Sequence, residues 1–265
     1  MSGTFELLFL GTGTSVGVPV IGCECAVCHS DDRRNKRTRS SIFVCCDGWR
    51  VLVDSGPDLR EQALREGLNC VDAVLYTHAH VDHVVGFDEL RAFCWRRDEP
   101  LPLHGSEETL AALRQMFPWA FVRGNVYGGY VKPDPQPFAG AIEFGDLRVE
   151  PLRVGHGSVV THGFLFEHTG HPALAYFSDV KEMSPDVIER IRGVDHLVVD
   201  ALRHDPHPTH MTVDEALAVV EASGARRGWL THLGHEVEHA TLEAGLPDHV
   251  RVAYDGLRIS LPAEK

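Results

Sequence analysis

Apolar runs that end at a histidine or an aspartate recur along this chain of 265 residues. Such short runs are typical of buried strands, and a polar residue placed at a strand end is available for chemistry. Five runs have this form: VDAVLYTHAHVDH (71–83), LRVEPLRVGH (147–156), ALAYFSD (173–179), HLVVDALRH (196–204) and RGWLTHLGH (227–235).

Helical patterns lie between these runs. They cover 58–67, 87–97, 106–117 and 211–224, and the last of them opens with Thr212 and Glu215 in a capping arrangement. Two further apolar runs, FELLFLG and RVLVDSG, continue into glycine-rich turns. Strands mixed with helices predict an α/β layered fold whose site lies at one edge of the sheets.

The segment THAHVDH places three imidazoles and a carboxylate within six residues, at His78, His80, Asp82 and His83. Protonated histidines repel one another, and an unpaired buried carboxylate is costly, so this crowding favours a bound transition metal over a polar surface loop. His78 and His80 alternate from one strand end. Asp82 and His83 follow one turn later and can face a second ion.

The spacing H-x-H-x-D-H resembles the signature of the metallo-β-lactamase superfamily, and the resemblance extends over nearly the whole chain. It implies one domain over residues 1–265, a four-layer αβ/βα sandwich (the metallo-β-lactamase fold), with two metals between the sheets. It also implies that His156 joins His78 and His80 on one metal, that His232 joins Asp82 and His83 on the other, and that Asp179 bridges the two.

A bridging carboxylate favours two oxygen-tolerant divalent ions, which generate a bridging hydroxide at neutral pH and stabilise the oxygens of an in-line displacement. That chemistry suits phosphodiester hydrolysis, so we expect a metal-dependent hydrolase acting on small cyclic or nucleotide-like phosphodiesters. Manganese or zinc is expected, with iron as a third candidate, because mixed nitrogen and oxygen sites accept several metals.

Three thiols are clustered near the start of the chain, at Cys23, Cys25 and Cys28. They supply three of the four ligands that tetrahedral zinc needs, and His29 or His235 is the fourth candidate. The stretch GTGTSVGVPVIGCECAVC, together with LTHxxH, resembles the branch that contains the cyclic phosphodiesterase of the carbon-phosphorus lyase pathway. That resemblance implies a structural zinc site completed by His235. The other four cysteines are expected in the core.

A second histidine group, LRHDPHPTH, contains His204, His207 and His210. By its spacing from His232, His210 matches the histidine that the phosphodiesterase branch places beside the metals, where it would protonate the leaving group. His210 is therefore the expected general acid, and Asp82 is counted as catalytic as well as ligating. His207 and His204 are the expected substrate-binding residues, with a solvent-exposed role as the alternative.

Two other segments have open interpretations. Residues 117–138 carry six aromatic side chains among glycines and prolines, which favours a lid or a homodimer contact alongside ordinary core packing. The basic run Arg33 to Arg39 is interpreted as a solvated surface loop.

Composition narrows the class of partner. A formal net charge of −13 repels polyanions, so nucleic acid is an unexpected partner and a small-molecule substrate is favoured. No signal peptide is recognisable and no stretch approaches a membrane span, so we expect a cytoplasmic protein without membrane contact. Three alternatives remain: a tRNA 3′-processing nuclease, a glyoxalase-type thioesterase, and a non-catalytic accessory protein similar to coenzyme PQQ synthesis protein B.

Overall fold

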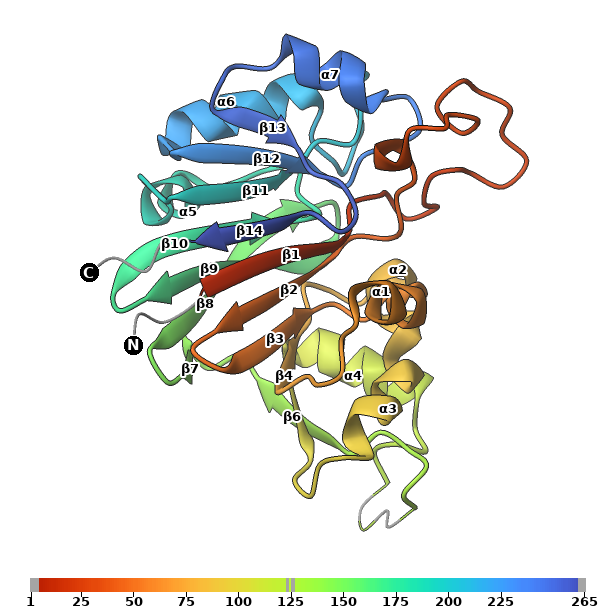
Figure 1. Cartoon of the computed structure of the whole chain (residues 1–265). Coiled ribbons are helices and arrows are strands. Elements are labelled where there is room, and N and C mark those ends of the chain that lie inside the picture. The colour runs from red at the N-terminus through yellow and green to blue at the C-terminus, as the bar shows by residue number, and fades with distance from the viewer. Residues whose placement is uncertain (1–4, 123, 125–126, 262–265) are drawn as a thin grey trace.

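A computed structural model describes residues 5–122, 124 and 127–261, and these residues form two mixed β-sheets packed face to face (Figure 1). The first sheet has the order β14 (Arg258–Leu261), β1 (Phe5–Gly11), β2 (Ser41–Cys46), β3 (Trp49–Val53), β4 (Ala73–Leu75), β5 (Leu101–Gly105), β6 (Pro133–Pro137). The second has the order β13 (Val250–Val252), β12 (Arg227–Thr231), β11 (His196–Asp200), β10 (His171–Phe177), β9 (Val159–His168), β8 (Leu147–His156), β7 (Ile142–Phe144).

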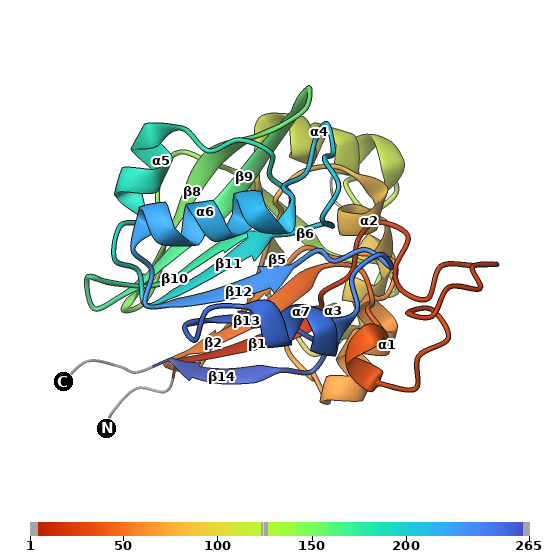
Figure 2. The ribbon, with the colours of Figure 1, turned by 90° about the horizontal axis from the view of Figure 1, so that it is seen from above.

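Helices cover the outer face of each sheet, as the view from above shows (Figure 2). The first sheet carries α1 (Leu59–Glu66), α2 (Val81–Val84), α3 (Arg91–Cys94), α4 (Glu107–Met116) and the 3₁₀ helix η2 (Val85–Leu90). The second sheet carries α5 (Pro185–Arg190), α6 (Val213–Ser223) and α7 (His239–Gly245), and a second 3₁₀ helix, η1 (Arg33–Asn35), lies in the N-terminal loop. The predicted αβ/βα sandwich is confirmed.

The strands are apolar on both faces because each sheet is covered on both sides. In β1, Leu7 and Phe9 belong to the cluster between the two sheets. Leu8 and Leu10, which alternate with them, pack under the helices of the first sheet. This explains why the sequence shows continuous apolar runs rather than alternation. The cluster between the sheets joins residues from Phe5 to Leu261, which supports the proposal of one domain.

Most predicted elements are present, with informative differences. Helix α6 has the predicted capping box between Thr212 and Glu215. The pattern over 87–97 predicts one helix, but the chain forms η2 followed by the single-turn α3, because Gly86 donates its N–H to the Ser55 carbonyl and so ties the first turn to the sheet. The strands β2, β5, β6, β7, β9, β13 and β14 were not predicted.

The basic run is partly buried, so its interpretation as a solvated loop is wrong for Arg37. That side chain is 1% exposed, and its guanidinium donates to the carbonyl oxygens of Gly234 and Val237. These hydrogen bonds offset the cost of taking the cation out of water.

The aromatic segment is divided between core and surface. Phe117 and Phe121 pack against Phe87 in the core of the first layer. Trp119 and Tyr127 are exposed by 41% and 61% of their surface. A lid or dimer role for residues 117–138 stays a prediction, and positions 123 and 125–126 of this segment lie outside the described residues.

Parallel strands bring the polar strand ends to one edge of the sandwich. Strands β10, β11 and β12 are parallel, and β8 runs in the same direction because both β8 and β10 are antiparallel to β9. Their carboxyl ends therefore meet on the side where the N-terminal loop projects, opposite the edge from which both termini emerge (Figure 1).

Candidate metal centre

The sequence THAHVDH folds as a strand end followed by a short helix. Strand β4 stops at Leu75, His80 is extended (φ −64°, ψ 147°) and stands as the N-cap of α2. Asp82 and His83 occupy the first turn of α2. The change from extended chain to helix sends these two side chains to a different place from those of His78 and His80, as the spacing predicts.

Two groups of ligand atoms converge at this edge. In the first, His78 Nε2 lies 2.8 Å from His80 Nδ1, and the rings of both residues lie 5.2 Å from that of His156. In the second, His83 Nε2 lies 3.2 Å from an oxygen of Asp82.

Asp179 lies between the two groups. One of its carboxylate oxygens is 3.2 Å from His83 Nε2, and the other is 3.5 Å from His232 Nε2. An oxygen of Asp179 also lies within 4.8 Å of the ring nitrogens of His78. All seven predicted ligands are thus brought together, although their spacing along the chain covers more than 150 residues.

Unsatisfied polar atoms indicate what this arrangement would hold. Among the described residues, His83 Nε2, His232 Nε2 and Asp179 Oδ2 are buried side-chain atoms that make no hydrogen bond. Buried polar atoms are normally satisfied, so three such atoms pointing at one another require an unusual explanation. Two divalent cations fit this donor set of imidazoles and carboxylates.

The ionisation states of His232, His78 and Asp179 agree with that use. Burial lowers the pKa of His232 to about 4, and burial lowers the pKa of His78 well below its usual value. Both imidazoles are therefore neutral at pH 7, the form that binds metal. Burial would raise the pKa of Asp179, but His232 and His83 hold it well below its usual value, so the group is a carboxylate. Burial would lower the pKa of His83, but the carboxylates of Asp179, Asp54 and Asp82 hold it well above its usual value, so a metal ion would have to displace its Nε2 proton.

Neighbouring groups fix which nitrogen each imidazole presents. His83 Nδ1 donates to Asp54 Oδ2 over 2.7 Å, and His156 Nδ1 donates to the Thr209 carbonyl over 2.8 Å. These contacts use the Nδ1–H of each ring and leave Nε2 free to face the cluster. Such outer partners orient metal-binding histidines and raise their basicity.

His78 and His232 are held in the same way by hydroxyl groups. Thr77 Oγ1, which donates to Asp54, accepts from His78 Nδ1 over 3.0 Å. Ser40 Oγ, which donates to the Gly13 carbonyl, accepts from His232 Nδ1 over 3.2 Å. The four rings whose Nδ1 is occupied in this way therefore present Nε2 to the candidate metal centre; they are those of His78, His83, His156 and His232.

His210 stands beside the cluster and is oriented by Asp200. Its Nδ1 lies 2.7 Å from Asp200 Oδ2, and its ring stacks on that of His232 at 4.7 Å and 11°. A ring nitrogen of His210 also lies within 4.8 Å of ligand atoms of His156 and Asp179, so His210 borders the candidate metal centre. His207 contacts the His210 ring at 5.1 Å, whereas His204 is exposed and has no described ring contact with this group.

Asp54 and Asp200 were missed as site residues at the sequence level. Both could have been found by the rule that polar residues at strand ends form the site, since Asp54 follows β3 and Asp200 ends β11. Asp54 has the unusual φ of 64°, which turns its carboxylate back toward Thr77 and His83.

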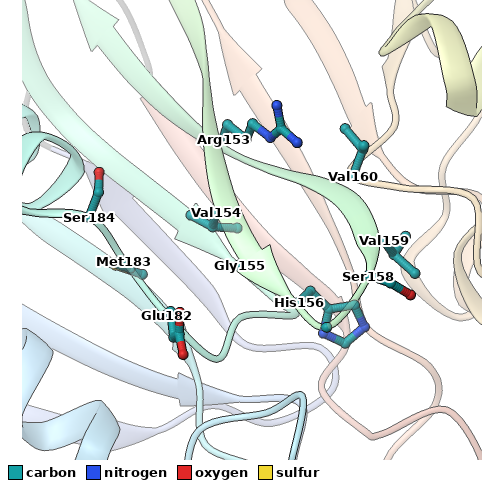
Figure 3. A pocket seen from close by; sticks show the side chains of 11 residues that line it. Arg153, Val154, Gly155, His156, Ser158, Val159, Val160, Glu182, Met183 and Ser184 are labelled. Carbon is teal, nitrogen blue, oxygen red and sulfur yellow. The ribbon is translucent and has the colours of Figure 1, made fainter.

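A pocket of about 380 Å³ opens beside His156, in the size range of small-molecule sites. Figure 3 shows the His156 ring at the tip of the β8–β9 hairpin, with Arg153 and Glu182 along opposite walls. Of the proposed metal ligands, His156 lines this pocket.

The thiol group forms a second candidate centre, at the base of the N-terminal loop. His235 Nδ1 lies 3.2, 3.6 and 3.7 Å from the sulfur atoms of Cys23, Cys25 and Cys28 respectively. The backbone N–H of Cys28 lowers the pKa of the Cys25 thiol to about 6, which favours the thiolate. Four nitrogen and sulfur atoms at this spacing fit tetrahedral zinc, and the exposed His29 is outside the group.

Arg37 connects the two centres. It donates to the Gly234 carbonyl over 2.7 Å, between His232 of the metal cluster and His235 of the thiol group. On its other side its backbone pairs with Val18 of the N-terminal loop in both directions. His232 itself has a φ of 58°, a left-handed conformation that needs such support from its surroundings.

A family model described as a Beta-lactamase superfamily domain matches residues 49–233, more than half of the chain. The chain belongs to the metallo-β-lactamase superfamily. The predicted family and its hydrolase class are therefore confirmed.

No helix among the described residues has the length and apolar character required to cross a bilayer.

Known relatives place the chain within this superfamily. The crystal structure of a diphosphatase from the PhnP family is 37% identical, covers 97% of both chains and superposes with a TM-score of 0.89. Coenzyme PQQ synthesis protein B of Methylobacterium radiotolerans is 28% identical over 97% of this chain and 100% of its own length. The chain is thus a superfamily hydrolase related to the PhnP family.

An octanoyltransferase of Porphyromonas gingivalis is 38% identical over 94% of this chain. The chain spans only 50% of that protein's length, so the activity in its name is not transferred to this chain.

Proposed function

We propose that the protein is a dinuclear metal-dependent phosphodiesterase that hydrolyses small cyclic or nucleotide-like phosphodiesters. The observation that carries this proposal is Asp179, whose two oxygens face His83 and His232 from opposite sides. A carboxylate shared in this way suits two hard divalent ions, manganese, zinc or iron. The 37% identity to a diphosphatase, whose reaction also breaks a phosphorus–oxygen bond, supports the same chemistry.

Two divalent ions in this centre would lower the pKa of a coordinated water and stabilise charge on the phosphate oxygens. His78, His80 and His156 would hold one ion. Asp82, His83 and His232 would hold the other, with Asp179 between them. The partners Asp54 and Thr77 keep the imidazoles in the orientation that leaves Nε2 free.

His210 would protonate the departing oxygen. Its contact with Asp200 at 2.7 Å fixes the ring, and a ring nitrogen of His210 lies at the candidate metal centre. Burial lowers the pKa of His210, which makes the protonated ring a stronger acid. His207, in contact with His210, would help to position the substrate. His204 is the weaker candidate for a phosphate contact because it lies exposed.

The pocket beside His156 would accept the part of the substrate that does not react. Arg153 supplies a positive charge on its wall. The net charge of −13 argues against a long polyanion such as tRNA as the substrate. Cys23, Cys25, Cys28 and His235 would bind the structural zinc, and a thiol cluster of this kind suits the reducing cytoplasm. Homodimer formation stays a prediction.

The decisive experiment compares four kinds of substrate on the metal-loaded enzyme: an aryl phosphodiester, nucleoside cyclic phosphates, a thioester and precursor tRNA. Hydrolysis of bis(p-nitrophenyl) phosphate and of nucleoside cyclic phosphates, with little turnover of S-lactoylglutathione, is the expected result. Preference for the thioester would overturn the proposal in favour of a glyoxalase-type enzyme. Cleavage confined to precursor tRNA would favour the nuclease, and no turnover of any of these substrates would favour an accessory protein.

A further inference from the structure

A separate group of metal-binding side-chain types lies at the opposite edge of the sandwich. Cys46 is the last residue of β2, Asp47 follows it in the turn to β3, and His168 is the last residue of β9. These turns lie at the edge where the chain termini emerge, away from the histidine cluster (Figure 1). A sulfur, a carboxylate oxygen and a ring nitrogen of the three residues all lie within 4.8 Å of one another.

The fold directs the three side chains toward the same point. Cys46 is fully buried in the cluster between the two sheets. His168 continues the inward-facing row of Phe164 and Phe166 on the other sheet and is 6% exposed. Asp47 opens an Asp-Gly hairpin turn with a φ of 48°, and its side chain is 28% exposed, which leaves one side of the group open to solvent.

The distances are near those of a tetrahedral zinc site. His168 Nε2 lies 2.7 Å from Asp47 Oδ2, and Cys46 Sγ lies 4.0 Å from the same oxygen. Zinc bond lengths imply separations of about 3.3 Å between nitrogen and oxygen and about 3.5 Å between sulfur and oxygen. Side-chain movements below about 1 Å would therefore produce the site. In the candidate metal centre, His78 Nε2 and His80 Nδ1 are similarly close, at 2.8 Å.

We propose that Cys46, Asp47 and His168 bind a further divalent cation of the zinc class. Thiolate and imidazole ligands select zinc-like ions over magnesium or calcium, and three protein ligands leave one position for water. Burial and the carboxylates of Asp47 and Asp146 raise the pKa of the Cys46 thiol to about 12, so zinc would have to displace the thiol proton on binding. The same carboxylates add negative potential that attracts a cation.

The bound ion would join the end of β2 in the first sheet to the end of β9 in the second. An ion that binds only the folded chain raises its stability by mass action. This site needs neither the catalytic ions nor the thiol group of the N-terminal loop, and it is independent of the proposed phosphodiesterase activity.

The test is an equilibrium zinc titration of chelator-stripped full-length protein in competition with a chromophoric chelator. The variants are Cys46→Ala and His168→Gln, the second of which keeps an amide donor for Asp47 but has no imidazole nitrogen. Cys45→Ala is the matched control, because Cys45 is the neighbour on the opposite face of β2. Wild type and Cys45→Ala should bind one zinc equivalent more than either variant.

Cobalt gives a second readout. The near-ultraviolet charge-transfer band of thiolate-bound cobalt should decrease in Cys46→Ala and persist in Cys45→Ala. Asp47→Asn, which keeps a residue suited to the turn, should weaken zinc binding at this site at least tenfold. Equal zinc stoichiometry in wild type, Cys46→Ala and His168→Gln would overturn the proposal and leave His168 and Asp47 as an ion pair between the sheets. If Cys46→Ala does not fold, the titration of His168→Gln decides the question alone.

Discussion

Replacement of His210 by alanine tests the proposed proton transfer, because its effect should depend on the leaving group. His210 is not one of the proposed ligands, and its ring is held by buried Asp200 through a 2.7 Å contact. Its side chain is 12% exposed, so water has limited access to replace it as a proton donor.

The expected magnitude follows from general acid catalysis. Loss of a positioned acid slows a reaction that needs it by ~10²-fold or more, equivalent to at least about 2.7 kcal/mol of transition-state stabilisation. Hydrolysis of a nucleoside 2′,3′-cyclic phosphate releases a ribose oxygen as the leaving group. This alkoxide is a poor leaving group and therefore needs the proton. A p-nitrophenolate needs little protonation, so bis(p-nitrophenyl) phosphate should lose much less.

The assay measures kcat/KM for both substrates with wild type and His210→Ala, together with the metal content of each protein. Asp200→Asn keeps the His210 ring but replaces the carboxyl group that accepts from His210 Nδ1 with an amide, so it should give a smaller loss with the same substrate dependence. His207→Ala is the control for general disturbance of the loop, and its losses should be similar for the two substrates.

Two results would refute this reasoning. Equal losses on both substrates in His210→Ala would show that His210 positions the phosphate and does not supply a proton. Loss of a catalytic ion in His210→Ala would make His210 a ligand, an outcome that its position within 4.8 Å of atoms of His156 and Asp179 makes worth measuring.

Three further predictions concern the metal centres and their support. Asp179→Asn should retain the shape of the site, lose one catalytic ion by elemental analysis and reduce hydrolysis by a factor on the order of hundreds or more, because the shared negative charge is removed; normal turnover with both ions present would contradict the bridging role. The single variants Cys23→Ser, Cys25→Ser and Cys28→Ser should each bind one zinc fewer, and mild chelation of wild type should remove activity before circular dichroism shows any unfolding; unchanged zinc content would contradict the structural site. Arg37→Met should lower the free energy of unfolding in urea by about 1–3 kcal/mol, because buried carbonyls lose their donors, and Arg33→Met, at an exposed position of the same run, should have little effect.

Much of the candidate centre could be predicted from the sequence because its signals are local. THAHVDH carries four ligand types in one segment, and strands that end at His156, Asp179 and near His232 share a direction within one sheet. The thiol group is likewise a local signal, since three of its members lie within six residues. Residue type and strand direction were therefore sufficient to predict the histidine cluster and the thiol group.

Other features could not be predicted from the sequence, because they depend on contacts between distant segments. The burial of Arg37 depends on the turn after His232, which lies about two hundred residues away along the chain. Strand β9 was missed because its two histidines and glycine interrupt the apolar pattern, and the fold uses Gly163 where the ring of Phe177 packs against the backbone.

By itself, the sequence determined the layered architecture, the superfamily and the set of residue types available for metal binding, since apolar periodicity and short-range spacing are properties of the chain. Only the tertiary structure decided which nitrogen of His83, His156 and His232 is free, because Asp54, Thr209 and Ser40 reach these rings from separate parts of the chain. It also decided that Cys46 and His168 meet across the two sheets, since packing of one sheet on the other brings together side chains that no local pattern relates.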